Sequence, residues 1–201
     1  MPTTYGAESV QLKPCKLPKA ALLSIGRLVR ACAEIEDIIN LYICGLAQIN
    51  VSQGIVFLGK TPVKRRVEMG EYLADMRGAV AAALHKQIFN SVFWEVQTCR
   101  NAVAHGTLMG VSKDRRYAFL TNLTKPTETS SAIQEVISYA VSDIAAFADI
   151  AEEAIPLLET RLKLQPLREE RHKRPLSPHR KAQPQRKKGA KFSRPPRSSR
   201  A

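Results

Sequence analysis

Aromatic residues are scarce in this chain. One Trp, five Tyr and six Phe make up only 6% of its 201 residues. Such a composition argues against an aromatic-rich β-sandwich, whereas an apolar content of 44% is enough to bury a core. The length is typical of one compact domain with an appendage.

Long apolar runs are also missing. The best stretch, residues 35–49, is interrupted by Glu36, Asp37, Asn40 and Gln48, and a spanning helix needs about 20 mainly apolar residues. We therefore expect no membrane span. Because the first residues lack the apolar segment of a secretory signal, we expect a cytoplasmic protein.

Cysteine is infrequent and unclustered. Cys15, Cys32, Cys44 and Cys99 form no CxxC pair and have no His beside them, which indicates reduced thiols rather than a disulfide framework or a zinc site. Gly-rich phosphate loops, HExxH, GxSxG and clustered carboxylates are missing too. The sequence thus gives no basis for nucleotide hydrolysis, proteolysis or metal-dependent nuclease chemistry, and we expect neither a metal nor a cofactor.

Acidic residues are few, with 18 Asp and Glu against 31 Lys and Arg. Thirteen Lys and Arg and two Glu give residues 166–201 a net charge of +11, which leaves +2 for residues 1–165. This Pro-rich tail is expected to be disordered and to bind a polyanion such as RNA. It could instead be solubilising, weakly attracted to membranes, or a ligand for an acidic protein. The candidate nucleic-acid-binding residues are Lys173, Arg174, Arg180, Lys181, Arg186, Lys187 and Lys188.

Apolar residues recur at steps of three and four over residues 18–49, which predicts a long amphipathic helix. Residues 1–17 lack this period and are expected to be a flexible lead. Residues 50–60, with two Gly and a short apolar run, are expected to form a loop that lays apolar side chains on the core. Thr61 and Pro62 resemble an N-cap followed by Pro at the first helical position. They predict a second helix that runs through Val67, Tyr72, Leu73, Met76 and Val80.

A third helix is predicted over residues 86–104, and Gly106 is expected to end it in the left-handed conformation. Residues 107–111 and 116–120 flank a polar turn and suggest a short β-hairpin. The helical period returns from residue 131, and Pro156 is expected to kink or divide this last helix. The predicted fold class is all-α, an up-and-down bundle of four to five helices over residues 18–165 with a disordered basic tail over 166–201.

The third helix has a second, polar face. At 100° per residue, Trp94, Gln97 and Ala104 fall opposite its apolar stripe, and small Ala104 would let another surface approach closely. We therefore predict a homodimer interface at these three residues. Arg100, Asn101 and His105 lie at the end of the same helix. Arg matches phosphate oxygens, and His can exchange protons near neutrality, so this group suits metal-free cleavage of RNA through its own 2′-OH.

Residues 100–106, with the sequence RNAVAHG, resemble the signature of the HEPN superfamily. That signature is an Arg separated by four to six residues from a His, with a polar residue directly after the Arg. The resemblance covers residues 18–165 by architecture and seven residues by motif. It implies a metal-independent endoribonuclease, commonly a toxin or defence effector, whose site forms when two motifs face each other across a dimer. Arg100 and His105 would be catalytic, Asn101 would orient them, and an antitoxin could be a partner.

Other functions stay open from the sequence. The same fold would serve as a non-catalytic module that binds a protein, a nucleotide or a nucleic acid, and the tail alone could coat RNA. Arg100 could also simply pair with an acidic residue of the first helix, for which Glu34, Glu36 and Asp37 are candidates. Asn101 and His105 would then be ordinary surface residues.

Overall fold

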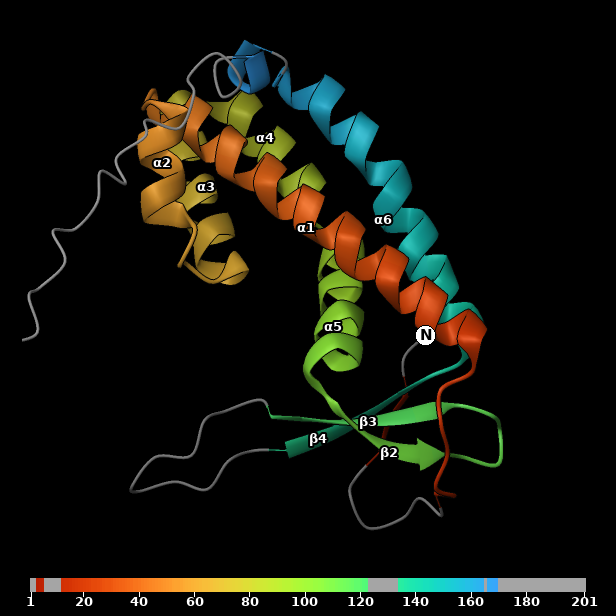
Figure 1. The fold of residues 1–201 in the computed structure, drawn as a ribbon. Coiled ribbons are helices and arrows are strands. Elements are labelled where there is room, and N and C mark those ends of the chain that lie inside the picture. The colour runs from red at the N-terminus through yellow and green to blue at the C-terminus, as the bar shows by residue number, and fades with distance from the viewer. Residues whose placement is uncertain (1–2, 6–11, 123–133, 165, 170–201) are drawn as a thin grey trace, which may run out of the picture.

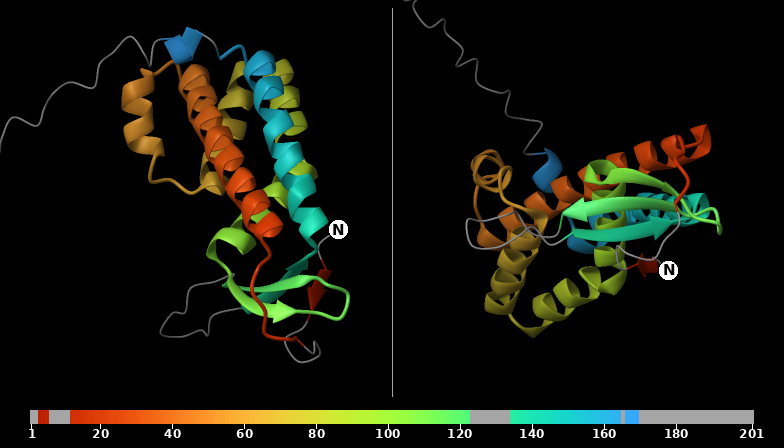
Figure 2. Two further views of the ribbon diagram at one scale, coloured as in Figure 1. Left: turned by 45° about the vertical axis from the view of Figure 1, so that its right-hand side comes forward. Right: turned by 90° about the horizontal axis from the view of Figure 1, so that it is seen from below.

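A computed structural model describes residues 3–5, 12–122, 134–164 and 166–169. This part of the chain is mostly helical, with an antiparallel sheet at one end of the helices (Figures 1 and 2). Its elements are β1 (Thr3–Tyr5), α1 (Lys19–Ala47), α2 (Val51–Leu58), α3 (Val63–Arg77), α4 (Ala79–Ile88), α5 (Ser91–His105), β2 (Thr107–Val111), β3 (Tyr117–Asn122), β4 (Gln134–Tyr139) and α6 (Val141–Leu162).

Helices α1 and α6 lie side by side and run parallel (Figures 1 and 2). Near the start of both, Arg27 binds Asp149 at 2.6 Å and Glu152 at 2.5 Å. Near the end of both, Leu167 packs against Gly45. The up-and-down arrangement predicted from the sequence does not describe this pair. Helices α1 and α6 can run parallel because all the other helices and most of the sheet lie between them in sequence.

The core lies mainly along these two helices. Residues with similar spacing in α1 and α6 are almost fully buried, as the amphipathic period predicted: Leu28, Cys32, Ile35, Ile39, Ile144, Phe147, Ala148 and Ala151. None of the described helices is both long and apolar enough to cross a membrane.

The sheet has the order β1-β4-β3-β2 with antiparallel pairs. The predicted hairpin is present as β2 and β3, but the helix predicted from residue 131 begins only at Val141. Residues 134–139 form strand β4 instead, and Val136, Ile137 and Tyr139 are buried in it. Helix α6 starts where Asp143 accepts a hydrogen bond from the Ala140 N–H at 3.0 Å.

Residues 50–60 were expected to be a loop but contain helix α2. The Asn50 side chain caps it by accepting a hydrogen bond from the Ser52 N–H at 3.0 Å. Of its apolar run, Leu58 is buried, whereas Val56 and Phe57 are about three-quarters exposed. The expected apolar contact with the core is therefore made by only part of the run.

The predicted second helix differs in its start and its end. Pro62 itself is the N-cap of α3, and the helix stops at Gly78 before α4 begins. Of the apolar residues through which the helix was predicted to run, Tyr72, Met76 and Val80 are 69%, 70% and 87% exposed. The buried side of α3 is formed instead by Arg66, Val67, Gly70 and Ala74, which recur at steps of three and four, and Tyr72 and Met76 lie off this stripe. Only Val80 lies beyond the break at Gly78.

Two further helix expectations are corrected. Gly106 ends α5 in the extended conformation (φ −74°, ψ 153°) rather than the left-handed one. Glycine is needed there because a Cβ would lie 2.3 Å from the Ala102 carbonyl oxygen. Of the two outcomes expected at Pro156, division of the helix is wrong, because α6 continues to Leu162, and the kink stays a prediction.

The packed body extends past both expected boundaries. In the region expected to be a flexible lead, β1 pairs with β4, and Lys13 pairs with Val111 at the outer edge of β2. Beyond residue 165, Leu167 packs against the core. The body therefore continues at least to Glu169.

Candidate functional site

Helix α5 carries the candidate residues from the helical core to the sheet (Figure 1). It begins where the Asn90 side chain accepts a hydrogen bond from the Phe93 N–H at 3.2 Å. Val96, Cys99 and Ala102 are at most 4% exposed and fix this helix against the core. Their burial determines the direction of the polar residues between and beyond them.

Arg100, Asn101 and His105 come together at the end of α5. The Arg100 Nη1 donates to Asn101 Oδ1 at 2.9 Å and lies 3.3 Å from His105 Nε2. Since a guanidinium can only donate, this contact is a hydrogen bond when Nε2 is unprotonated, which places the ring proton on Nδ1. Asn101 and His105 are exposed.

Arg100 also pairs with α1. Its Nη2 lies 3.5 Å from Glu36 Oε1, so the alternative expectation of an acidic partner on the first helix is met by Glu36. The other carboxylate oxygen of Glu36 binds Arg66 at 2.5 Å, and Arg66, only 5% exposed, also donates to Asn40 at 2.9 Å. Glu36 thus holds two guanidinium groups beside the motif.

A cleft of about 500 Å³ adjoins this group between α5 and the α2–α3 connection. The side of α3 contributes Lys60, Thr61, Pro62, Val63, Lys64 and Arg66, and that of α5 contributes Trp94, Gln97, Thr98, Arg100 and Asn101, with Glu36 from α1. Four of these side chains are cationic and one is anionic, so the cleft favours a negatively charged ligand.

Two of the three residues predicted for a dimer interface line this cleft of their own chain. Gln97 is 4% exposed and Trp94 is half-buried, whereas Ala104 is exposed. The sequence pattern placed Trp94 and Gln97 on one side of α5, but it did not predict that the start of α3 lies opposite them. Lys60, Lys64 and Thr98 were not recognised as site residues, and the only available signal was two Lys flanking a helix start.

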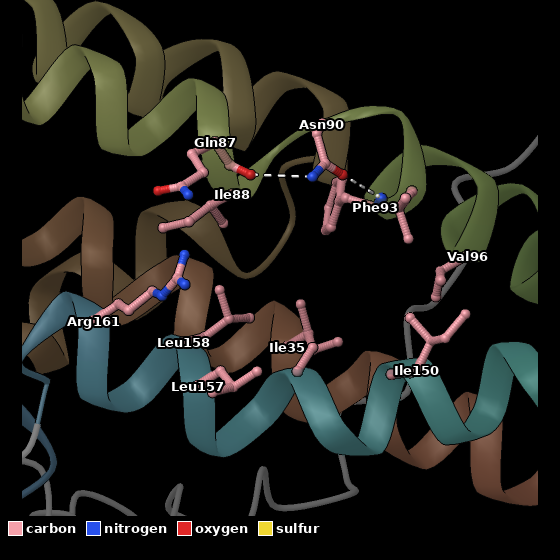
Figure 3. A pocket seen from close by; sticks show the side chains of 13 residues that line it. Ile35, Gln87, Ile88, Asn90, Phe93, Val96, Ile150, Leu157, Leu158 and Arg161 are labelled. Carbon is pink, nitrogen blue, oxygen red and sulfur yellow. Dashed lines mark hydrogen bonds between the residues drawn. The ribbon is translucent and has the colours of Figure 1, made fainter.

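An apolar groove of about 290 Å³ lies between α6 and the α4–α5 corner (Figure 3). Its lining includes Ile35, Val96, Ile150 and Leu158, and Arg161 of α6 points toward Ile88 at one end. This groove offers apolar contacts and lacks His, Cys and carboxylate side chains among its lining residues. The lining of this groove thus differs from that of the cleft beside α5, which carries four cationic side chains and one carboxylate.

The buried cysteines are not chemically activated. None of the four cysteines forms a disulfide, as the sequence predicted. Burial raises the pKa of the Cys32 thiol to about 11 and that of Cys99 to about 12. Both therefore stay protonated near neutral pH and act as small apolar core residues.

The candidate nucleic-acid-binding residues of the tail, Lys173 to Lys188, lie outside the described residues. Within the described ranges, no group of three or more His, Cys, Asp or Glu side chains is arranged to hold a metal ion. Comparison with known proteins finds no matching family model, no matching curated protein and no matching solved structure.

Proposed function

We propose that the protein is a HEPN-like metal-independent endoribonuclease that acts as a homodimer, in the manner of a toxin or defence effector. The observation that carries this proposal is the contact of Arg100 with both Asn101 and His105 at the exposed end of α5. Arg100, a permanently charged group that can bind a phosphate, and His105, a group that can transfer protons, are thereby close enough to act on the same phosphodiester linkage of RNA.

In the proposed reaction, the unprotonated Nε2 of His105 takes the proton of a ribose 2′-OH. The 2′ oxygen attacks the adjacent phosphorus, and the bond from phosphorus to O5′ breaks. The imidazolium then returns a proton to O5′, which gives a 2′,3′-cyclic phosphate and a 5′-OH. Arg100 neutralises the charge that develops on the phosphate, and Asn101 keeps the guanidinium in place.

The proposed site is composite, with two motifs facing each other across a dimer. Asn101, Ala104 and His105 are exposed on α5, so a second copy can reach them. Small Ala104 allows close approach of the two helices. A partner antitoxin would have access to the same exposed helix end.

The test is cleavage of a mixed RNA pool in EDTA by the wild type and by His105→Ala and Arg100→Ala. Loss of one acid–base group is expected to lower the rate by about 10²- to 10⁴-fold. The wild-type products are expected to carry 2′,3′-cyclic phosphate ends. Arg65→Ala is the matched control, because Arg65 is exposed on α3 and pairs only with Glu68 among the described residues.

Equal circular dichroism and thermal unfolding of all variants would show that the fold is retained. Sedimentation of the wild type at micromolar concentration is expected to give a dimer. Cleavage that survives His105→Ala, or a clean monomer that cleaves, would contradict the composite site. A folded dimer without activity would favour the alternative, a non-catalytic binding module.

A further inference from the structure

We propose that the cleft between α5 and the start of α3 binds one nucleotide of a single-stranded RNA. The phosphate would lie at the N-terminus of α3, and the base would lie against Trp94. The identity of the ligand as RNA rests on the proposed function, whereas the preference for an anion with an aromatic group rests on the cleft itself.

The phosphate end of the cleft is the start of α3, a helix of 15 residues. The first N–H groups of a helix have no partner inside the helix, and the helix dipole favours an anion there. Pro62, the N-cap residue, has no side-chain oxygen to accept from them, and Thr61 donates instead to the Phe57 carbonyl at 3.2 Å. The first turn of α3 contains no acidic residue.

Lysine side chains add charge at this helix start. Lys60 and Lys64 both line the cleft and are exposed, and within the described ranges neither forms an ion pair. Both ammonium groups are therefore free to neutralise a phosphate. Glu36 is the one carboxylate of the lining, and its pairs with Arg66 and Arg100 offset its charge.

An independent observation is a set of buried polar atoms without partners in the wall of the cleft. The side-chain nitrogen of Gln97, a residue only 4% exposed, has no hydrogen-bond partner, and neither do the Nε atoms of Arg66 and Arg100. All three atoms are donors, and a buried donor without a partner is costly. Small shifts on binding would satisfy them with the oxygens of a phosphate or a base.

Trp94 supplies the aromatic surface. It is the only Trp of the chain, is half-buried, and packs edge-to-face on Phe93 with ring centroids 4.9 Å apart. Aromatic side chains on a basic groove are the usual way to bind unpaired bases without strong sequence preference. Base-paired RNA hides its base faces, so the cleft is specific for single strands.

The cleft continues into the motif. Arg100 and Asn101 line it, and Arg100 also contacts His105. A nucleotide seated here would place the next phosphate of the strand toward Arg100 and His105. The cleft would thus position the linkage that is cut.

The experiment is a titration of the full chain carrying His105→Ala with oligouridylate, followed by the fluorescence of Trp94. Because this variant cannot cleave by the proposed route, the signal reports binding alone. Saturable quenching is expected. Labelled oligouridylate followed by anisotropy measures total binding, including any contribution of the basic tail.

The double variant Lys60→Ala/Lys64→Ala is expected to bind oligouridylate at least tenfold more weakly, as measured by Trp94 quenching. The slope of log K against log salt should fall by about 0.7, since each phosphate that is neutralised on a single strand contributes about 0.7. Lys19→Ala/Lys86→Ala is the matched control, because both residues are exposed outside the cleft and the net charge is the same. Equal losses in the two double variants would overturn the proposal.

Gln97→Met separates binding from a merely structural role. Removing a buried donor that lacks a partner is expected to raise Tm while weakening oligouridylate binding several-fold. A fall in both Tm and affinity would instead assign Gln97 a structural role and remove the second observation.

The outcomes also separate this inference from the proposed function. Anisotropy that reports binding without any change in Trp94 fluorescence would overturn the cleft as the binding site while leaving cleavage unaffected. Quenching that depends on Lys60 and Lys64, in a protein that never cleaves RNA, would support the cleft and remove the nuclease. The same titration with inorganic phosphate tests the base subsite. If inorganic phosphate quenched Trp94 at the same phosphate concentration as oligouridylate does, the cleft would be an anion site without a base subsite, which would contradict the role of Trp94.

Discussion

His85 is a buried histidine outside the proposed site. It is 2% exposed and packs against Tyr42 of α1 and Phe89, with ring centroids 5.9 Å and 4.5 Å away. Gly70 leaves room for its ring, since a Cβ there would lie 3.0 Å from it. Burial lowers the pKa of His85, Glu71 and Asp75 oppose this change, and Lys86 adds to it.

The lowered pKa makes stability depend on pH. The unfolded chain takes up a proton at His85 below about pH 6.5, whereas the folded chain takes it up only at lower pH. The stabilising contribution of neutral, buried His85 to the free energy of unfolding is thus complete above the pKa of the unfolded chain. It is lost as the pH falls below that pKa. We expect the Tm difference between the wild type and His85→Gln to shrink from pH 7.5 to pH 5.0. Thermal unfolding of both proteins over this pH range measures the Tm difference. A Tm difference that grows on acidification would contradict the lowered pKa of His85.

The residues of the motif could be predicted from sequence because their geometry is local. Asn101 and His105 are one helical turn apart, and Arg100 reaches both from the same helix. Lys60 and Lys64 could not be predicted as their neighbours. Their place depends on how α3 packs on α1, and no spacing within either helix encodes that contact.

At the level of elements, the corner between α3 and α4 depends on Gly78. Its φ of 106° and ψ of 174° lie in a region that residues with a Cβ avoid. The same residue ends α3 and precedes the first residue of α4. The corner carries α4 back across the molecule, so this backbone conformation determines where His85 and the start of α5 lie.

Gly78→Ala is expected to lower the free energy of unfolding by about 1–3 kcal/mol through backbone strain alone, because nothing lies within 4 Å of its Cβ position. Gly26→Ala is the matched control. Gly26 lies inside α1 with equally open space, so the same change should raise the free energy by about 0.5–1 kcal/mol. Urea unfolding of both variants measures the two values, and equal signs would refute the strain argument.

The elements differ in how well the sequence predicted them. The long apolar stripes of α1 and α6 are hard to mistake for strands. Residues 134–139 are ambiguous, because Val136, Ile137 and Ala140 fit a helical period as well as a buried strand, and pairing with β3 decides it. The breaks before α2 and α5 had a local signal that was missed, since Asn50 and Asn90 are both side-chain caps.

At the scale of the whole molecule, the charge is divided between a nearly neutral body and a basic tail. The described body reaches Glu169, so a chain truncated there keeps Leu167 on the core. We expect truncation after Glu169 to raise KM for RNA and reduce its salt dependence while leaving kcat unchanged. Steady-state cleavage at several salt concentrations measures this. Complete loss of activity would instead assign the function to the tail.

The parallel pairing of α1 and α6 also affects how the protein is made. The contacts of Arg27 and Arg30 with α6 join residues 122 to 125 positions apart. At a synthesis rate of about 5–20 residues per second, α1 waits on the order of 10 s on the ribosome before its partner is made. During that interval its apolar stripe has no α6 to cover it. The nascent chain therefore exposes this apolar stripe to solvent until α6 has been synthesised.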